Sequence, residues 1–203
     1  MHRLAAAKVN LYLHVAAPDA RGYHPLQSLV MFADIGDEVA IGEGRGLTVD
    51  GPFGDGLSAG EDNLIVKALR RFEAATGSTV DAAFRLTKDL PVASGLGGGS
   101  ADAGAALHLL RARVTPDMAD DALAAVAAQT GADGVMCLWA RTAFAEGYGE
   151  ILTPVTLPAL PCVLINPGVE CPTAAVYNGL DHLARFDEIE ARQGFDGVIN
   201  IEH

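Results

Sequence analysis

The stretch that decides the fold reads Leu90-Pro91-Val92-Ala93-Ser94-Gly95-Leu96-Gly97-Gly98-Gly99-Ser100-Ala101-Asp102-Ala103. Alternating apolar residues from 80 to 86 predict a strand before it, and the small residues from 100 to 110 predict a helix after it. Glycines let backbone N–H groups approach an anion, and a helix amino terminus adds unpaired donors and a partial positive charge. The stretch therefore predicts a phosphate-binding loop, in which Ser100 is available to a phosphate or to its metal ion.

Two other kinds of glycine-rich loop do not fit this stretch. No Lys-Ser or Lys-Thr pair closes it, so it is not a Walker A loop. No acidic residue follows at the end of a second parallel strand, which argues against a dinucleotide fingerprint. The plain alternative is a flexible glycine turn that caps a helix. Glycine at four of the five positions from 95 to 99 favours the phosphate loop over that alternative.

Composition limits the function classes. Half of the 203 residues are hydrophobic, and the formal net charge is -12. Such an acidic chain favours neither nucleic acid nor an anionic membrane as a partner, so a phosphorylated ligand needs a local device. The three cysteines show neither a disulfide framework nor metal-ligand spacing, and no apolar run reaches membrane-spanning length. We expect a cytoplasmic protein that is a monomer or a homodimer.

The remaining periodicities predict strands mixed with helices. Either Asp62 or Asn63 can cap the start of one helix, which stops at Gly77, and Thr115-Pro116 predicts the start of another that stops at Gly131. A last helix is expected at residues 173–183. Strands are expected at residues 7–15, 26–32, 37–41, 47–49, 80–86, 135–139 and 162–165. In the first strand the side chains predicted to share the buried face are Val9, Leu11, Leu13 and Val15.

The glycine stretch resembles the second motif of the GHMP small-molecule kinases, which wraps the phosphates of ATP. The shared pattern is Pro-x-x-x-Gly-Leu-Gly-Gly-Gly-Ser-Ala, here Pro91 to Ala101. The resemblance implies ATP and Mg²⁺ as cofactors, with every residue from Pro91 to Ala101 in the ATP loop. It also implies an α+β, GHMP-kinase-like two-domain fold.

Four further stretches are similar to one family within this superfamily, the 4-diphosphocytidyl-2-C-methyl-D-erythritol kinases. They are residues 7–11, residues 21–28 with their Gly-Tyr-His segment, residues 62–64, and residues 131–133. They occur in the family's order and span most of residues 5 to 180. The resemblance implies ATP-dependent phosphorylation of the substrate's 2-hydroxyl, a step of non-mevalonate isoprenoid and terpenoid precursor biosynthesis.

The same resemblance implies a catalytic pair. Asp133 would be the general base on the substrate alcohol, and Lys8 would favour its ionised form and orient the hydroxyl. Taken singly, Lys8 has the plain alternative of a solvated strand lysine, and Asp133 that of a turn residue after a helix. Their combination with the glycine loop favours catalysis.

Five residues would contact the substrate according to the resemblance. The cytosine ring would lie between Tyr23 and Tyr177, and His24 would read its polar edge. Asn10 and Thr173 would contact other polar parts of the substrate. Without the resemblance, His24 is as readily a turn histidine that binds nothing.

The sequence departs from the family pattern in two places. Gly134-Val135 follow Asp133 where the family has Val-Pro, and the glycine is expected to loosen the backbone that aims the carboxylate. Nothing from Arg185 onward resembles the family's continuation with its third glycine-rich motif. We therefore expect an amino-terminal ATP-binding and catalytic domain at residues 1–152 and an incomplete second domain with a divergent tail at residues 153–203.

Two alternatives to an active kinase of this family stay open. One is a catalytically impaired remnant that binds nucleotide or substrate without turnover, or that partners another chain. The other is a GHMP kinase for a different small alcohol, although the Gly-Tyr-His segment speaks against it. Thermal stabilisation of the chain by a ligand, without formation of product, would indicate the impaired remnant. A panel of substrates would distinguish a GHMP kinase for a different alcohol.

Overall fold

The fold is built on a long antiparallel pair of strands. In the computed structural model, which describes residues 1–169 and 171–183, this pair is β1 (His2–Val15) and β2 (Leu26–Gly42). One end of β2 pairs with β4 (Ala83–Thr87), and the other end pairs with β5 (Ala143–Glu146). β3 (Gly46–Asp50) is parallel to β4, and β6 (Ile151–Pro154) is antiparallel to β5. The sheet therefore has the order β3-β4-β2-β5-β6, with β1 beside β2.

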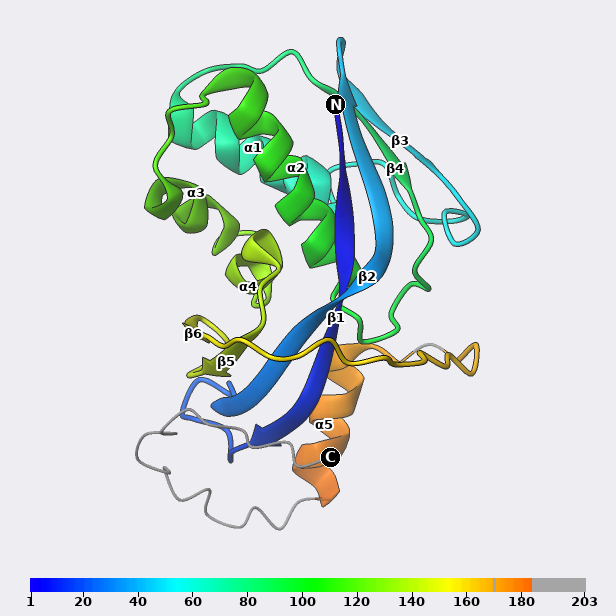
Figure 1. The fold of residues 1–203 in the computed structure, drawn as a ribbon, viewed down its shortest axis with the longest axis vertical. Helices are drawn as coiled ribbons and strands as arrows, with labels where there is room; N and C mark the ends of the chain where they lie inside the picture. Colours follow the sequence, from blue (N-terminus) through cyan, green and yellow to red (C-terminus); the bar gives the residue numbers. More distant parts are fainter. Residues whose placement is uncertain (170, 184–203) are drawn as a thin grey trace.

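Helices gather on one side of these strands (Figure 1). They are α1 (Leu64–Thr76), α2 (Gly98–Val114), α3 (Asp120–Ala127) and α4 (Gly134–Trp139). A further helix, α5 (Thr173–Leu183), lies beside the opposite end of β1 and β2 (Figure 1). The predicted α+β class is confirmed. Among the described residues no helix is long and apolar enough to cross a membrane.

The main core fills the space between the helices and the β4 end of the sheet. Its fully buried side chains include Val39, Ile65, Phe72, Leu86, Leu107 and Leu110. Burying each such side chain is worth about 1.5–3 kcal/mol. A smaller cluster of Val30, Met136, Ala143 and Ala145 fills the other end. The two clusters fix α2 and α4 against β1, and these elements carry the site described below.

Several predicted elements were placed correctly. α1 begins after Asn63, whose side chain accepts a hydrogen bond from the Ile65 N–H, and it ends at Gly77 with φ 66°. Helix 173–183 and strand 47–49 are also confirmed, the latter within β3. The strands predicted at 26–32 and 37–41 are one continuous strand, because β1 pairs with β2 along both segments.

Other predictions were wrong. Residues 135–139 are helix α4 and not a strand, because a short buried apolar run has no periodicity that separates the two. Residues 162–165 form no strand, and Val163 there is 85% exposed. The helix predicted from Thr115 begins only at Asp120.

The predicted buried face of the first strand also fails. Leu11 and Leu13 are exposed, whereas Lys8 is buried. Two register shifts, between Ala6 and Lys8 and between Asn10 and Tyr12, explain the change, because they interrupt the regular alternation of side chains between the two faces of β1. The divergent tail expected from Arg185 lies outside the described residues.

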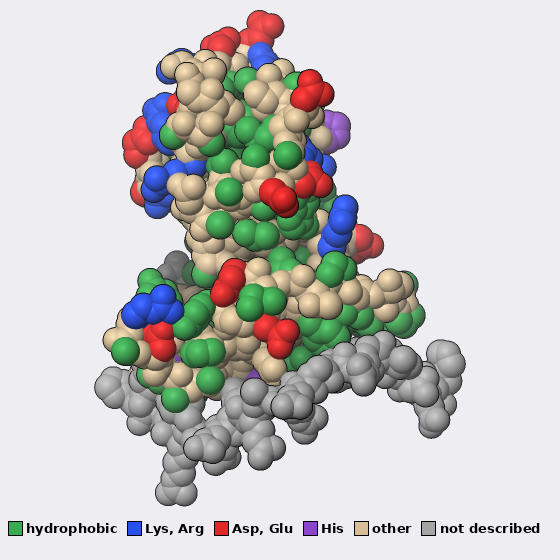
Figure 2. Space-filling view, turned by 90° about the vertical axis from the view of Figure 1, so that its left-hand side faces the viewer, with side chains coloured by type: hydrophobic (Ala, Val, Ile, Leu, Met, Phe, Trp, Pro, Cys, Tyr) green, Lys and Arg blue, Asp and Glu red, His purple; other side chains and the backbone are tan. Residues whose placement is uncertain are grey.

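Charges of both signs are spread over the surface. On the face shown in Figure 2, acidic side chains occur from end to end, and most of the lysines and arginines lie beside them. That face carries no basic patch for a polyanion. An anionic ligand on such a surface has to be captured locally, by backbone donors or by a few chosen side chains.

Candidate active site

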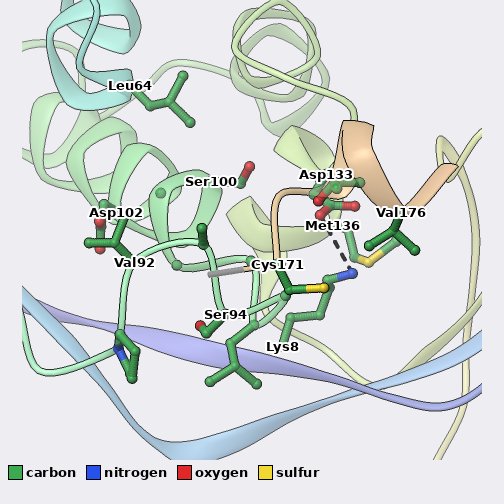
Figure 3. A pocket seen from close by; sticks show the side chains of 18 of the residues that line it. Lys8, Leu64, Val92, Ser94, Ser100, Asp102, Asp133, Met136, Cys171 and Val176 are labelled. Atoms are coloured by element: carbon green, nitrogen blue, oxygen red, sulfur yellow. Dashed lines mark ion pairs between the residues drawn. The ribbon is translucent and has the colours of Figure 1, made fainter. Parts of the chain in front are cut away.

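A cavity of about 780 Å³ lies between β1, the glycine loop and α5. Figure 3 shows Lys8 and Asp133 pointing toward each other in it, with Ser94 and Ser100 nearby. The predicted site residues that line it are Lys8, Asn10, every residue from Pro91 to Ser100, Asp133, Thr173 and Tyr177. Ala101 is buried in the core and does not line the cavity. The structure thus brings together residues that are more than 160 positions apart in the sequence.

The predicted catalytic pair forms an ion pair. Lys8 Nζ lies 3.5 Å from Asp133 Oδ2, and the lysine is buried while the aspartate is partly exposed. The ammonium also donates to Asn10 Oδ1 at 3.2 Å. Asn10 Nδ2 in turn donates to Ser28 Oγ at 2.7 Å, which fixes the amide orientation. A chain of hydrogen bonds from β2 to β1 therefore aims the Lys8 ammonium at Asp133.

Asp133 is held at the start of α4 by a tight turn. The Gly134 N–H donates to the Gly131 carbonyl at 3.0 Å, and the Cys137 N–H donates to the Asp133 carbonyl at 2.9 Å. A Cβ at position 134 would lie 2.1 Å from the Ala127 carbonyl oxygen. Gly134 therefore permits a close backbone approach, contrary to the expectation that it loosens the chain here. The Asp133 side chain makes no capping bond to α4, so its carboxylate stays available to Lys8 and to the cavity.

The glycine loop presents backbone donors to the same cavity. Gly95 and Gly97 have φ 76° and 67°, values that favour glycine. Gly97 is the N-cap of α2 and has no side chain with which to bond the first N–H groups of that helix. Those groups remain available to an anion, and the helix dipole favours negative charge there. The Lys8 N–H donates to the Leu96 carbonyl at 2.8 Å, which joins the loop to β1.

The predicted substrate residues are divided between two places. Tyr177 lines the main cavity, and the His24 ring lies 5.1 Å from the Tyr177 ring. His24 is buried, with Nδ1 2.8 Å from the Ala16 carbonyl oxygen. Burial raises the pKa of Tyr177, and the charge of Asp133 raises it further. Tyr177 therefore forms an aromatic corner of the main cavity, and His24 packs against its ring without being among the residues that line the cavity.

Tyr23 lies outside the main cavity. It is 63% exposed, and its ring packs 6.1 Å from that of Tyr148. The Arg21 guanidinium lies over both rings, 5.7 Å and 5.0 Å from their centroids. These side chains line a second cavity of about 260 Å³, which Gly131 and Ala132 also line. In this structure Tyr23 and Tyr177 do not face each other.

Sequence reasoning missed two parts of the cavity wall. One is the segment before α1, where Gly56, Leu57 and Ser58 line the cavity. The other is the pair Lys88 and Asp102, which flank the glycine loop in the sequence. Two ionisable residues placed on either side of an anion-binding motif were a signal that the sequence offered.

Comparison with known proteins gives one consistent result. Residues 63–141 match the model of the GHMP kinases N terminal domain. The chain is 52% identical over 182 residues to the 4-diphosphocytidyl-2-C-methyl-D-erythritol kinase of Caulobacter vibrioides (strain NA1000 / CB15N), a match that covers 87% of this chain and 62% of that protein. It is 46% identical over 203 residues to the kinase of the same name from Caulobacter sp. (strain K31), covering 98% of this chain and 69% of the relative.

A solved structure agrees with these relatives. The crystal structure of 4-(cytidine 5'-diphospho)-2C-methyl-D-erythritol kinase matches with a TM-score of 0.74 at 36% identity. The match covers 89% of this chain and 64% of that one. The chain thus spans a little under two thirds of the Caulobacter vibrioides relative and of this solved structure.

Proposed function

Because the chain belongs to the 4-diphosphocytidyl-2-C-methyl-D-erythritol kinase family of GHMP kinases, we propose that it transfers the γ-phosphoryl group of ATP to the 2-hydroxyl of 4-diphosphocytidyl-2-C-methyl-D-erythritol. The observation that carries the proposal is the Lys8–Asp133 pair, 3.5 Å apart, in the same cavity as the glycine loop. Phosphoryl transfer requires a base, a positive charge and a phosphate cradle within reach of one another. This cavity contains all three. The reaction would belong to non-mevalonate isoprenoid precursor biosynthesis.

In the proposed reaction Asp133 accepts the proton of the attacking hydroxyl. Lys8 lies beside that carboxylate and donates a hydrogen bond that orients the hydroxyl. The bond that forms joins the hydroxyl oxygen to phosphorus, the bond that breaks releases ADP, and the proton moves to Asp133 Oδ. Since Lys8 is anchored by Asn10, the pair needs little rearrangement before it acts.

The phosphates would be held by the loop backbone. The N–H groups at the start of α2, next to Gly97, point to the cavity without a side-chain cap. Among the described residues no cluster of three His, Cys, Asp or Glu could hold a metal ion. Mg²⁺ that accompanies nucleotide phosphates keeps several waters and needs only one or two protein ligands. Ser100 lines the cavity and fits that role, in which Mg²⁺ would supply positive charge to the transferring group.

The cytidine end of the substrate would lie at the aromatic corner of the cavity. Tyr177 offers a ring face to the base, and the buried His24, which packs against Tyr177, would reach the polar edge of the base after a rearrangement. Asn10 and Thr173 supply polar contacts between this corner and the catalytic pair. For Tyr23 to join Tyr177 around the base, its ring has to leave Tyr148 when substrate binds.

A competition between alcohols tests the proposed substrate. The chain would be supplied with ATP, Mg²⁺ and an equimolar mixture of 4-diphosphocytidyl-2-C-methyl-D-erythritol, mevalonate, a hexose and homoserine, and the products would be identified by mass spectrometry. We expect phosphate on the cytidyl alcohol alone. Phosphorylation of another alcohol would favour the alternative of a different GHMP kinase. Binding of ATP and substrate without any product would favour the impaired remnant.

Other features of the chain also remain proposals. We place the protein in the cytoplasm, where its three thiols would stay reduced; the described ones, Cys137, Cys162 and Cys171, are free. The division into domains at residues 1–152 and 153–203, and a monomeric or homodimeric state, likewise stay predictions.

A further inference from the structure

A buried ion cluster lies beneath the glycine loop, and the chemistry proposed above does not use it. Lys88 Nζ contacts Asp37 Oδ2 and lies 3.1 Å from Asp102 Oδ2. At most 4% of each of these three side chains is exposed. Burying charges costs free energy that their pairing seldom returns in full, so the cluster is a poor device for stability alone.

The cluster connects the two ends of the loop. Asp37 Oδ1 accepts the N–H groups of Asp89 and Leu90 at 2.7 and 2.8 Å, immediately before Pro91. Asp102 lies on α2, immediately after the last loop glycines. Lys88 bridges these two carboxylates, so a single ammonium group links the segment that enters the loop to the helix that leaves it.

Gly98, the first residue of α2, also packs close to this ammonium group. A Cβ at Gly98 would lie 2.9 Å from Lys88 Nζ and 3.4 Å from Asp37 Oδ2. Both Lys88 and Asp102 line the main cavity, beside the N–H groups of the loop. The position of those N–H groups therefore depends on where the bridge holds Gly98.

We propose that the Lys88–Asp102 bridge is a positioning device that fixes the span of the glycine loop, and thereby the placement of the backbone N–H groups that receive the ATP phosphates. The bridge acts through the loop and does not touch the reacting atoms. The role of the bridge in catalysis rests on the proposed function. The test of the bridge therefore includes a measurement that needs no turnover.

The charge state of Asp102 is compatible with a site for phosphates. Burial raises the pKa of Asp102 to about 7, with Lys88 opposing that effect and Asp37 adding to it. Asp102 Oδ1 is buried and has no hydrogen-bond partner. A carboxyl group with a pKa of about 7 is partly protonated near neutral pH, so the cluster carries less negative charge under the loop than two full carboxylates and one ammonium would give. The charged or titratable groups near Asp102 are Lys88, Asp37 and the Cys137 thiol of α4.

A matched pair of variants tests the bridge. Asp102→Ala removes the acceptor on α2 and leaves Lys88 and Asp37 as a balanced pair, whereas Asp102→Asn keeps an oxygen for Lys88. For Asp102→Ala we expect the KM for ATP to rise about tenfold or more while kcat changes less than about threefold, because a misplaced loop weakens phosphate binding. We expect Asp102→Asn to restore most of the affinity. Lys67→Met, an exposed lysine on α1, serves as the unrelated control.

Hydrogen exchange of the loop amides gives the readout that needs no substrate. In Asp102→Ala the amides of residues 92–101 should exchange faster than in the unmodified chain, while those of α1 keep their protection. Unchanged loop exchange in a folded Asp102→Ala variant would overturn the proposal. So would equal impairment of the alanine and asparagine variants. Should Asp102→Ala fail to fold, Lys88→Met/Asp37→Asn breaks the same bridge without an unpaired charge and is judged by the same exchange. Absence of product from the unmodified chain would count against the proposed function only.

Discussion

At the scale of single residues, the site depends on a lysine and an aspartate placed where their charges meet at the edge of a cavity. Lys8 is buried and oriented by Asn10, whereas Asp133 is partly exposed and anchored only through its backbone. The two roles differ accordingly. Lys8 supplies a fixed charge, and Asp133 keeps a free oxygen for a proton.

The first prediction concerns Asp133→Asn, which keeps the shape of the side chain and removes its basicity. We expect kcat to fall by about 10²–10⁴-fold, the usual contribution of a general base, with the KM for ATP little changed. The chain should still unfold cooperatively on heating, because the amide oxygen of the new side chain can accept from Lys8 and the carboxylate does not cap α4. Asp117→Asn, on an exposed turn, is the control in the steady-state assay. An Asp133→Asn variant that keeps more than about a tenth of the activity would rule out the base.

A second prediction concerns the pH dependence of stability caused by Asp102. Its pKa is raised from 3.8 to about 7, so the folded chain holds a proton that the unfolded chain has lost between these values. The protonated Asp102 therefore contributes to the unfolding free energy. This contribution is complete below pH 3.8 and is lost as the pH rises through about 7. Relative to Asp102→Asn, the unmodified chain should therefore lose roughly 2–4 kcal/mol of unfolding free energy between pH 5 and pH 8. Urea unfolding of both proteins at the two pH values measures this, and parallel pH profiles would refute it.

At the scale of elements, amphipathic periodicity predicted α1 and β1 well, and the glycine stretch predicted the strand–loop–helix unit around α2. Amphipathic periodicity failed to predict α4, because most apolar residues of this helix are buried. It also failed for the inner face of β1, because a register shift near Leu11 depends on the partner strand. Neither feature is local, and so neither could be found from spacing alone.

The third prediction concerns the turn that holds Asp133. A Cβ at Gly134 would collide with the Ala127 carbonyl, whereas one at Gly131 would meet only Ser100 Oγ at 3.7 Å. Gly134→Ala should therefore destabilise the chain by about 1–3 kcal/mol through overpacking and should lower kcat by shifting α4. Gly131→Ala should be close to neutral. Chemical unfolding and steady-state rates of the two variants provide the comparison. Equal behaviour would show that the close approach at Gly134 does not matter.

At the scale of the whole molecule, the long β1–β2 pair joins the two ends of the fold, and the cavity opens where the glycine loop, α4 and α5 meet beside it. The order of motifs in the sequence was enough to expect Lys8, the glycine loop and Asp133 in one site, and all of them line this cavity. It was not enough to place Tyr23, which depends on its packing against Tyr148, or to find the bridge from Asp37 through Lys88 to Asp102. Both depend on contacts between residues more than a dozen positions apart.

The most direct test is the stoichiometry of phosphoryl transfer. ADP and phosphorylated 4-diphosphocytidyl-2-C-methyl-D-erythritol would be quantified in the same reaction, with the alcohol present and with it omitted. We expect one product for each ADP, and almost no ADP when the alcohol is omitted, because Asp133 and Lys8 are placed to activate a bound hydroxyl and not water. A folded chain that binds ATP but forms no product, or that releases ADP whether or not the alcohol is present, would contradict the assignment of this cavity as a kinase active site.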